Sequence, residues 1–260
     1  MADAIRAHHP SLIVLLNHIG LPEAAHDVFR KAADGAPIAA WLADHIEQPP
    51  PDCLPNLDAV HAFDSATLPM LRDFYQKTTV RPGFLPLAVN PARFTHRTRP
   101  WARRRHGLVF VGNHTADRLD VIHKLQGLGL PVASYGPRAE AGWRIWRKRR
   151  ASPAATAAHY SGHQVVLNML QFPNTIHGVN LRAYEIPACG GLGTYPETPD
   201  ITQSFEPGTE ILTYQDLPSL IHKLESLNPE TAEAIITRSY RRTLSQHTYA
   251  QRARSLLHEI

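Results

Sequence analysis

The chain has 260 residues, of which 43% are apolar, and this is enough for one large domain or two of moderate size. The formal net charge is +4 at pH 7, and 16 histidines make the protein more basic in mild acid. This composition excludes a wholly disordered chain, and the apolar runs are too short for a transmembrane helix. Positive charge concentrates in residues 97–105 and 144–150, which favours an anionic partner.

The cysteine content indicates a reducing compartment. Cys53 and Cys189 lie far apart in unlike surroundings, so no disulfide framework is expected and a cytoplasmic location is predicted. Neither cysteine belongs to a Cys/His cluster, and we therefore expect no structural metal.

The N-terminal half alternates between strands and helices. Apolar runs predict strands at 11–16 and 37–42 around a helix at 22–33. Ligands of parallel sheets bind beyond the carboxyl ends of the strands. This places three candidate site residues, His18, Asp44 and His45, near a cleft, although each is equally an ordinary capping or solvated residue.

Two further strands are expected at 58–63 and 83–88, and Asp64 caps the helix between them. The apolar periodicity then lapses in a basic, proline-containing segment that ends near His106, where we place the domain boundary. We interpret Arg103, Arg104 and Arg105 as a solvated linker in preference to a nucleic-acid site.

A second series of strands and helices begins with a strand at 107–112 and a helix at 116–128. The turn at Gly112 and Asn113 is a weak phosphate-loop signal, because it lacks both GxGxxG and the Lys-Ser/Thr of a P-loop. Another strand ends at Tyr135 and Gly136. Basic residues and two tryptophans follow at 142–150, which indicates an amphipathic helix or an anion-binding segment.

Strands are predicted at 164–168, 193–195 and 211–214, with helices between them and after them. The expected architecture is α/β with parallel sheets.

The stretch from 177 to 191 carries the strongest chemical signal. Asn180 is expected to cap a short helix that places Arg182 and Glu185 on one face and ends at Gly190. The helix N-terminus and Arg182 would suit a phosphate, and Glu185 would accept hydrogen bonds from ribose hydroxyls. The alternative is a buried helix with an internal Arg182–Glu185 ion pair.

This stretch resembles the CgeB-like (spore-maturation type) glycosyltransferases, and the resemblance extends over about residues 10–258. The matching string is Gly178-Val179-Asn180-x-Arg182-x-Tyr184-Glu185-Ile186-Pro187-Ala188-Cys189-Gly190-Gly191. Weaker matches are Phe84–Phe94, Phe110–Asn113, Phe205–Ile211 and His247–Ala253.

The resemblance implies a GT-B fold, in which two Rossmann-like domains bind an acceptor and a nucleotide sugar. It further implies a retaining, metal-independent transferase that needs no cofactor and takes a UDP-, GDP- or dTDP-sugar as its donor. The acceptor would be a glycan, a protein or a small molecule. His177 stands where related enzymes have an acidic residue. The donor-binding residues implied are Glu185, Arg182, Asn180, Gly178, His177, Gly112, Asn113, Tyr135 and Gly136; His18, Asp44 and His45 would orient or deprotonate the acceptor hydroxyl.

The expected domains are an N-terminal domain at 1–100, a nucleotide-sugar domain at 101–245 and a C-terminal helix at 246–260 that packs back on the first domain. The first domain is short for this fold, and we expect it to be incomplete, with an exposed edge strand. The alternative function is a non-catalytic module that binds a glycan, nucleic acid or protein partner on a transferase scaffold.

Overall fold

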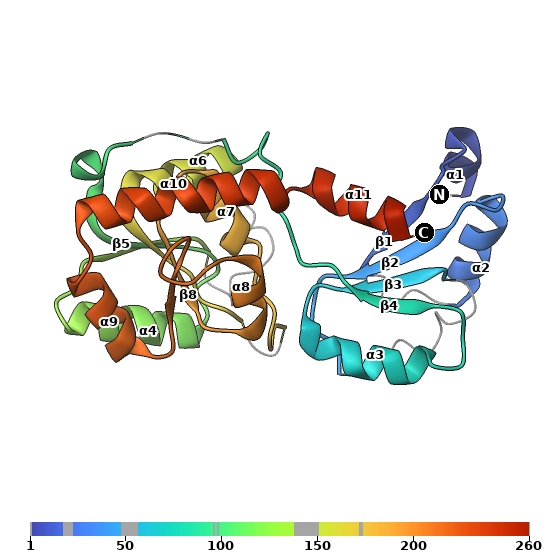
Figure 1. The fold of residues 1–260 in the computed structure, drawn as a ribbon, viewed down its shortest axis with the longest axis horizontal. Helices are drawn as coiled ribbons and strands as arrows, with labels where there is room; N and C mark the ends of the chain where they lie inside the picture. The colour runs from blue at the N-terminus through green and yellow to red at the C-terminus, as the bar shows by residue number, and fades with distance from the viewer. Residues whose placement is uncertain are drawn as a thin grey trace. The chain divides into compact units, whose positions relative to one another are not determined.

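The computed structural model describes residues 2–17, 23–47, 57–95, 97, 99–137, 151–171 and 174–259. Its chain divides into two compact units (Figure 1). The first unit contains residues 1–87, 171–179 and 250–260, and the second contains 88–170 and 180–249. His18, Cys53 and the basic, tryptophan-containing segment 142–150 lie outside the described residues.

The first unit is built on a parallel sheet with the order β1-β2-β3-β4. Its elements are α1 (Ala2–His8), β1 (Ile13–Leu16), α2 (Glu23–Ala32), β2 (Ile38–Leu42), β3 (Ala59–Ala62), the 3-10 turn η2 (Ser65–Thr67), α3 (Leu68–Tyr75), β4 (Arg81–Phe84) and most of α11 (Tyr249–Glu259). The central strands β2 and β3 are buried throughout, as continuous apolar runs predict.

The edge strand β1 differs from the central strands, because its residues alternate between partly buried and exposed positions. Val14 is 38% exposed and Leu16 is 64% exposed. The last strand, β4, ends at Phe84, four residues before the predicted end. Pro82 within β4 and Pro86 beyond it both lack an N–H, which is tolerated because β4 is an edge strand.

The second unit contains a five-stranded parallel sheet with the order β6-β5-β7-β8-β9. Its elements are η3 (Trp101–Arg103), β5 (Arg105–Val111), α4 (Ala116–Gly127), β6 (Val132–Tyr135), α6 (Pro153–Gly162), β7 (His163–Leu167), α7 (Arg182–Ala188), β8 (Gly193–Pro196), α8 (Pro199–Ser204), β9 (Leu212–Tyr214), α9 (Leu217–Glu225) and α10 (Pro229–Gln246). Helices α4 and α9 lie on one face of this sheet, and α6 and α10 lie on the other (Figure 1).

The strand order of the second unit creates a topological switch point. From β5 the chain moves outward to β6, and it then returns to place β7 on the other side of β5. Connections that leave in opposite directions open a crevice at the carboxyl ends of these two strands, and α/β proteins bind ligands there.

The C-terminal helix is tied to the first unit through its arginine. Arg252 is buried, and its Nε and Nη2 donate to the carbonyl oxygens of Pro86 (2.6 Å) and Leu87 (3.1 Å). Near the end of α11, Glu259 Oε2 lies 2.5 Å from Nε2 of the buried His61 on β3. Residues 250–260 therefore belong to the first unit, although they follow the second unit in the chain.

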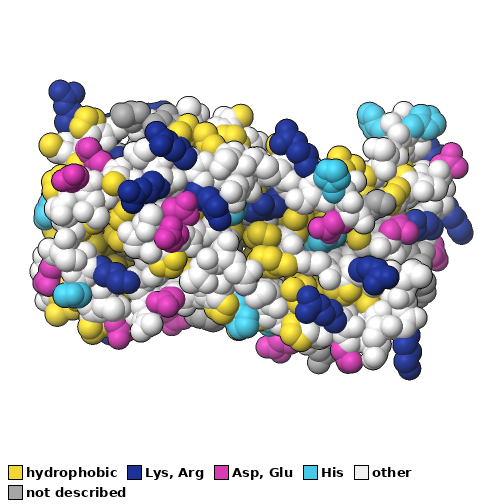
Figure 2. Space-filling model, viewed as in Figure 1, with side chains coloured by type: hydrophobic (Ala, Val, Ile, Leu, Met, Phe, Trp, Pro, Cys, Tyr) yellow, Lys and Arg dark blue, Asp and Glu magenta, His cyan; other side chains and the backbone are white. Residues whose placement is uncertain are grey.

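The basic segment before β5 is only partly the solvated linker expected from the sequence. Arg103 and Arg105 are exposed, whereas Arg104 is buried and donates to the carbonyl oxygens of Arg99 (3.0 Å) and Gly190 (2.9 Å). Around α10, the visible face carries Lys and Arg interspersed with Asp and Glu (Figure 2). No helix among the described residues is long and apolar enough to cross a membrane.

Candidate functional site

The candidate site lies at the switch point of the second unit, where β5 and β7 end. Gly112 and Asn113 follow β5, and Asn168 and Met169 follow β7. Parallel strands bring these four residues to the same edge of the sheet, and α7 begins at Arg182, 13 residues after Met169. The buried Phe110 lies immediately beneath this edge.

Glycine is required at two neighbouring positions of this edge. A Cβ on Gly112 would lie 2.9 Å from Phe110 Cζ and 3.2 Å from Nη2 of Arg182. A Cβ on Gly136 (φ 146°) would lie only 2.0 Å from the carbonyl oxygen of Gly112. The Gly112 N–H donates to the carbonyl of Tyr135 at 3.0 Å. The two glycines therefore allow close packing of the strand ends, and Gly112 lets the Arg182 guanidinium approach the backbone.

Two arginines meet on the ring of Phe110. Arg182 from α7 and Arg118 from α4 each place Cζ 5.6 Å from the ring centroid. Arg118 is buried, and its guanidinium donates to the carbonyl oxygens of Asn113 (3.2 Å) and Met169 (3.3 Å). It thereby ties together the loops after β5 and β7.

In the described part of the chain, this pair of cations has no counter-charge. Among the described residues, neither Arg118 nor Arg182 forms a salt bridge, and the Nε atoms of both are buried without a hydrogen-bond partner. Burial lowers the pKa of Arg118 to about 10, and the nearby charge of Arg182 adds to the effect. Buried charges are normally paired, so the arrangement is suited to an anionic ligand.

Asn180 does not cap α7 as the sequence predicted. The N-cap position belongs to Leu181, which makes no side-chain cap bond. Instead the Asn180 Nδ2 donates to Asn168 Oδ1 (2.9 Å) and to the Met169 carbonyl (3.2 Å). Its Oδ1 and the Nδ2 of Asn168 are buried without partners in the described part of the chain. The Asn180 amide therefore contacts the residues that follow β7 at the switch point and does not cap α7.

Glu185 lies on the partly buried part of α7, near Tyr160 of α6 and Arg182. Burial raises the pKa of Tyr160, the charge of Glu185 raises it further, and Arg182 opposes the shift. The Glu185 carboxylate and the Arg182 guanidinium therefore both lie near the buried Tyr160 hydroxyl. Glu185 and Arg182 share this neighbour, and they make no salt bridge in the described structure.

His177 and Gly178 belong to the first unit, although they adjoin Asn180 in sequence. The buried Asp64 carboxylate accepts N–H bonds from Ile176 (2.7 Å), His177 (3.1 Å) and Ala66 (2.9 Å). Ser65 Oγ lies 3.2 Å from His177 Nδ1. Gly178 packs closely on Asp64, whose Cα would lie 3.2 Å from an added Cβ.

Asp44 and His45 follow β2, at the carboxyl edge of the first sheet. Asp44 accepts a 2.7 Å hydrogen bond from Asn17 Nδ2. His45 Nδ1 lies 3.0 Å from Thr67 Oγ1, and its backbone N–H donates to the Asn174 carbonyl at 2.8 Å. This edge therefore brings Asp44, His45 and His177 together with Asp64, which sequence reasoning treated only as a helix cap.

The second unit brings together Gly112, Asn113, Gly136, Asn180, Arg182 and Glu185. The ring of Tyr135 is stacked instead on His159, with centroids 3.7 Å apart. Sequence reasoning missed Arg118 and Asn168. A signal for Arg118 was present, because Arg118, Ile122 and Leu125 have the i, i+4, i+7 spacing of a buried helix stripe. Among the described residues, no group of His, Cys, Asp and Glu is placed to hold a metal ion.

The profile of a family described as "Glycosyl transferase-like" matches residues 116–258, more than half of the chain. The chain therefore belongs to this glycosyltransferase-like family. A search of curated protein sequences found no match.

Solved glycosyltransferases of the GT-B type share the fold. The chain is similar to the α,α-trehalose 6-phosphate synthase of Burkholderia multivorans, with a TM-score of 0.67 and 14% identity over 98% of this chain and 72% of the other. It is also similar to the UDP-forming α,α-trehalose-phosphate synthase of Burkholderia xenovorans in complex with glucose-6-phosphate (TM-score 0.66, 12% identity, 98% and 75% covered). The Anabaena protein HepE in complex with UDP gives a TM-score of 0.61 at 13% identity, with 99% and 80% covered. The two parallel-sheet units are thus those of the GT-B fold.

Proposed function

We propose that this protein is a CgeB-like glycosyltransferase that moves a sugar from a nucleotide-diphosphate donor to an acceptor, with retention and without a metal. The observation that carries the proposal is the pair of arginines, Arg118 and Arg182, which meet over Phe110 without a carboxylate partner among the described residues. They lie at the switch point, where folds of this kind bind nucleotides.

The arginines suit the charge that develops in sugar transfer. Cleavage of the bond between sugar and diphosphate leaves negative charge on the leaving phosphate, and fixed cations stabilise it more in the transition state than in the ground state. Arg182 would contact the diphosphate directly. Arg118 donates to two loop carbonyls and would act through its charge and by positioning the Asn113 loop. The short α7, with seven residues, contributes less than these side chains.

Glu185 would hold the ribose, because a carboxylate accepts hydrogen bonds from two adjacent hydroxyls. Gly112, Gly136 and Asn113 would allow the phosphates to approach the backbone. Asn168 and Asn180 would direct their amide groups to the donor. Of the similar structures, one is a UDP-forming synthase and another is a complex with UDP, which supports UDP over GDP or dTDP.

The acceptor would be bound by the first unit. Asp44 and His45, held by Asn17 and Thr67, are the candidates for orienting or deprotonating its hydroxyl. His177 replaces the acidic residue of related enzymes and would hydrogen-bond to the sugar or phosphate. His18 remains a candidate from sequence alone.

Isothermal titration with UDP, GDP and dTDP tests the donor site. We expect UDP to bind, and Arg182→Ala to weaken it by about 10- to 100-fold, because charge-assisted hydrogen bonds are lost. Glu185→Ala should also weaken UDP but leave inorganic pyrophosphate unaffected, since pyrophosphate has no ribose. Arg238→Ala, an exposed arginine of α10, is the matched control.

Equal UDP affinity in the parent and in both site variants would refute the assignment. If UDP-sugars bind tightly but are neither transferred nor hydrolysed over many hours, the protein is a binding module on a transferase scaffold.

A further inference from the structure

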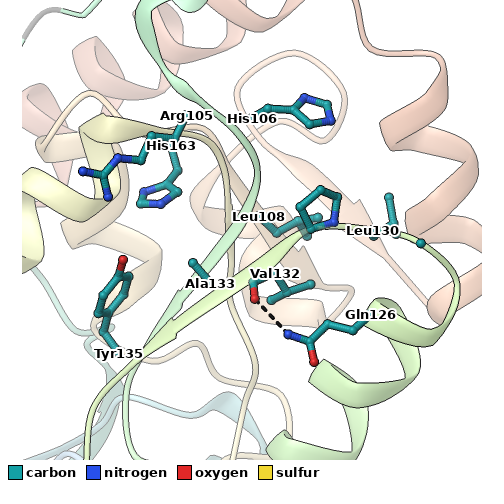
Figure 3. A pocket seen from close by; sticks show the side chains of 11 residues that line it. Arg105, His106, Leu108, Gln126, Leu130, Val132, Ala133, Tyr135 and His163 are labelled. Atoms are coloured by element: carbon teal, nitrogen blue, oxygen red, sulfur yellow. Dashed lines mark hydrogen bonds between the residues drawn. The ribbon is translucent and has the colours of Figure 1, made fainter.

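A cavity of the second unit lies toward the amino-terminal ends of β5 and β7, away from the switch point between their carboxyl ends. It has a volume of about 630 Å³ and is lined by the first residues of β5, the turn before β6 and the start of β7. Arg105, His106, Gln126, Pro131, Tyr135 and His163 are among its walls (Figure 3). Nothing in the proposed sugar transfer uses this cavity.

Its basic side chains lie at the starts of β5 and β7. Arg105 and His106 open the strand β5, and His163 opens β7, while none of the described residues that line the cavity is acidic. Figure 3 shows the Arg105 guanidinium, the His163 imidazole and the Tyr135 hydroxyl on the same side of the cavity. The ring centroids of Tyr135 and His163 are 6.4 Å apart.

The imidazole of His163 has a defined orientation. The residue is buried, and its Nδ1 lies 3.0 Å from the carbonyl oxygen of His159. A carbonyl can only accept, so Nδ1 carries the hydrogen and Nε2 is protonated only in the imidazolium form. His159 in turn stacks on Tyr135 at an interplanar angle of 25°. The backbone bond therefore orients His163 in the cavity wall, and the stacked ring of His159 supports Tyr135 from behind that wall.

Burial and the neighbouring positive charges disfavour the protonated form of His163. Burial lowers the pKa of His163, partly offset by its bond to the His159 carbonyl, and Arg105 and Arg99 lower it further. Burial also lowers the pKa of His159, with added effects from His163 and Arg105. Among the described residues, Arg99, Arg105 and His159 act on His163, and His106 and Tyr135 line the same cavity; none of these five groups carries a negative charge near neutral pH.

We propose that this cavity is a second anion site, which binds the phosphate group of a small phosphorylated molecule on Arg105 and the imidazolium form of His163. A phosphate would supply the counter-charge that the described wall lacks, and it presents the acceptor oxygens that guanidinium and imidazolium donors require. The site lies on the second unit alone and is separate from the arginine pair at the switch point.

Titration with inorganic phosphate, followed through the histidine ring signals in NMR spectra, tests the proposal. Phosphate should shift the His163 signals, and Arg105→Ala should weaken its binding about tenfold. Arg103→Ala is the matched control, since Arg103 is an exposed arginine two residues earlier that does not line the cavity. Arg105→Glu should abolish binding while thermal unfolding confirms that the variant folds.

Sulfate serves as a second probe, because its charge does not change between pH 6 and 8 whereas that of phosphate does. Sulfate should bind more tightly at pH 6 than at pH 8, and this difference should disappear in His163→Gln.

Two controls separate this site from the donor site. Arg182→Ala should leave phosphate binding at the cavity unchanged, and saturating UDP should not displace the phosphate. If phosphate binding is lost in Arg182→Ala but kept in Arg105→Ala, the anion occupies the switch point and the second site is refuted. Failure of UDP to bind would refute the proposed function without affecting the cavity.

Discussion

At the scale of single residues, the arginine pair on Phe110 depends on a glycine. The close approach of Arg182 to Gly112 leaves no room for a side chain, because an added Cβ would contact Phe110 Cζ at 2.9 Å and Arg182 Nη2 at 3.2 Å. Phe110 is fully buried and cannot give way easily, so the guanidinium must move. The position of the cation is thus determined partly by the missing Cβ of its neighbour.

Gly112→Ala should therefore weaken UDP binding by about tenfold, equivalent to ~1.4 kcal/mol. A double-mutant cycle with Arg182→Ala measures the coupling between the two substitutions in UDP binding. If Gly112→Ala acts by displacing Arg182, it should have little further effect once Arg182 is gone. Additive losses of UDP affinity in the double variant would show that Gly112 contributes independently of the arginine.

His159 and His163 make the stability of the protein depend on pH. Burial lowers the pKa of His159 and His163 below the value of about 6.5 that they have when unfolded. Below that pH the unfolded chain binds more protons than the native protein, so stability is full above about pH 6.5 and is lost as the pH falls. Urea unfolding between pH 8 and 5.5 should show this loss. His159→Gln and His163→Gln should each reduce the loss, and an undiminished loss in both variants would contradict the assignment.

At the scale of elements, two glycines at the end of α4 allow the effect of backbone conformation to be measured apart from that of packing. Gly127 and Gly129 both have open space where a Cβ would lie, but only Gly129 has a left-handed backbone, with φ 84°. Gly127 is the last residue of α4. Their substitutions therefore differ mainly in the backbone conformation that alanine must adopt.

Gly129→Ala should destabilise the protein by about 1 kcal/mol, because L-residues disfavour positive φ. Gly127→Ala should stabilise it by about 0.5 kcal/mol, since alanine restricts the unfolded chain more than glycine does. Chemical denaturation of the two variants beside the parent measures both changes. The prediction fails if the two free energies of unfolding change in the same direction.

Much of the element order was predictable because buried parallel strands are continuous apolar runs. The strands β2, β3, β5 and β7 lie within or beside the predicted ranges, and the turn at Gly112 adjoins Arg182. The partners of Asn180 were not predictable in this way. The local sequence pattern favours a helix cap. In the structure, the Asn180 amide instead donates to Asn168 and Met169, which follow β7 earlier in the chain. Arg118 was missed because its carbonyl partners become neighbours only when β5 and β7 pair.

At the scale of the whole molecule, α11 completes the first unit through Arg252. Arg252→Met should lower the free energy of unfolding by about 2–3 kcal/mol, because the carbonyls of Pro86 and Leu87 lose a charged donor. Arg254→Met is the control on the same helix, since Arg254 is exposed. Urea unfolding measures both variants. Similar losses of stability would show that the helix, rather than its buried guanidinium, matters.

The sequence predicted domains as consecutive ranges, 1–100, 101–245 and 246–260. In the structure, each of the two units is instead made of segments that are separated in the sequence. The string Gly178–Gly191 resembles one functional block, yet Gly178 and Val179 belong to the first unit, as does His177 before them, and the remainder belongs to the second. The separation arises because the Asp64 carboxylate binds the N–H groups of Ile176 and His177. Such a contact joins residues more than a hundred positions apart, and no local pattern reveals it.

The division of the first unit into separate chain segments has a consequence for synthesis on the ribosome. The first 87 residues emerge early, but the unit that they begin also needs residues 171–179 and 250–260. Until then Asp64 lacks the N–H groups of Ile176 and His177, and the Pro86 and Leu87 carbonyls lack Arg252. The second unit has all of its residues once Tyr249 has been made. The half that begins first is therefore the half that finishes last, and a nascent chain must keep its N-terminal sheet from aggregating while the C-terminal sheet folds.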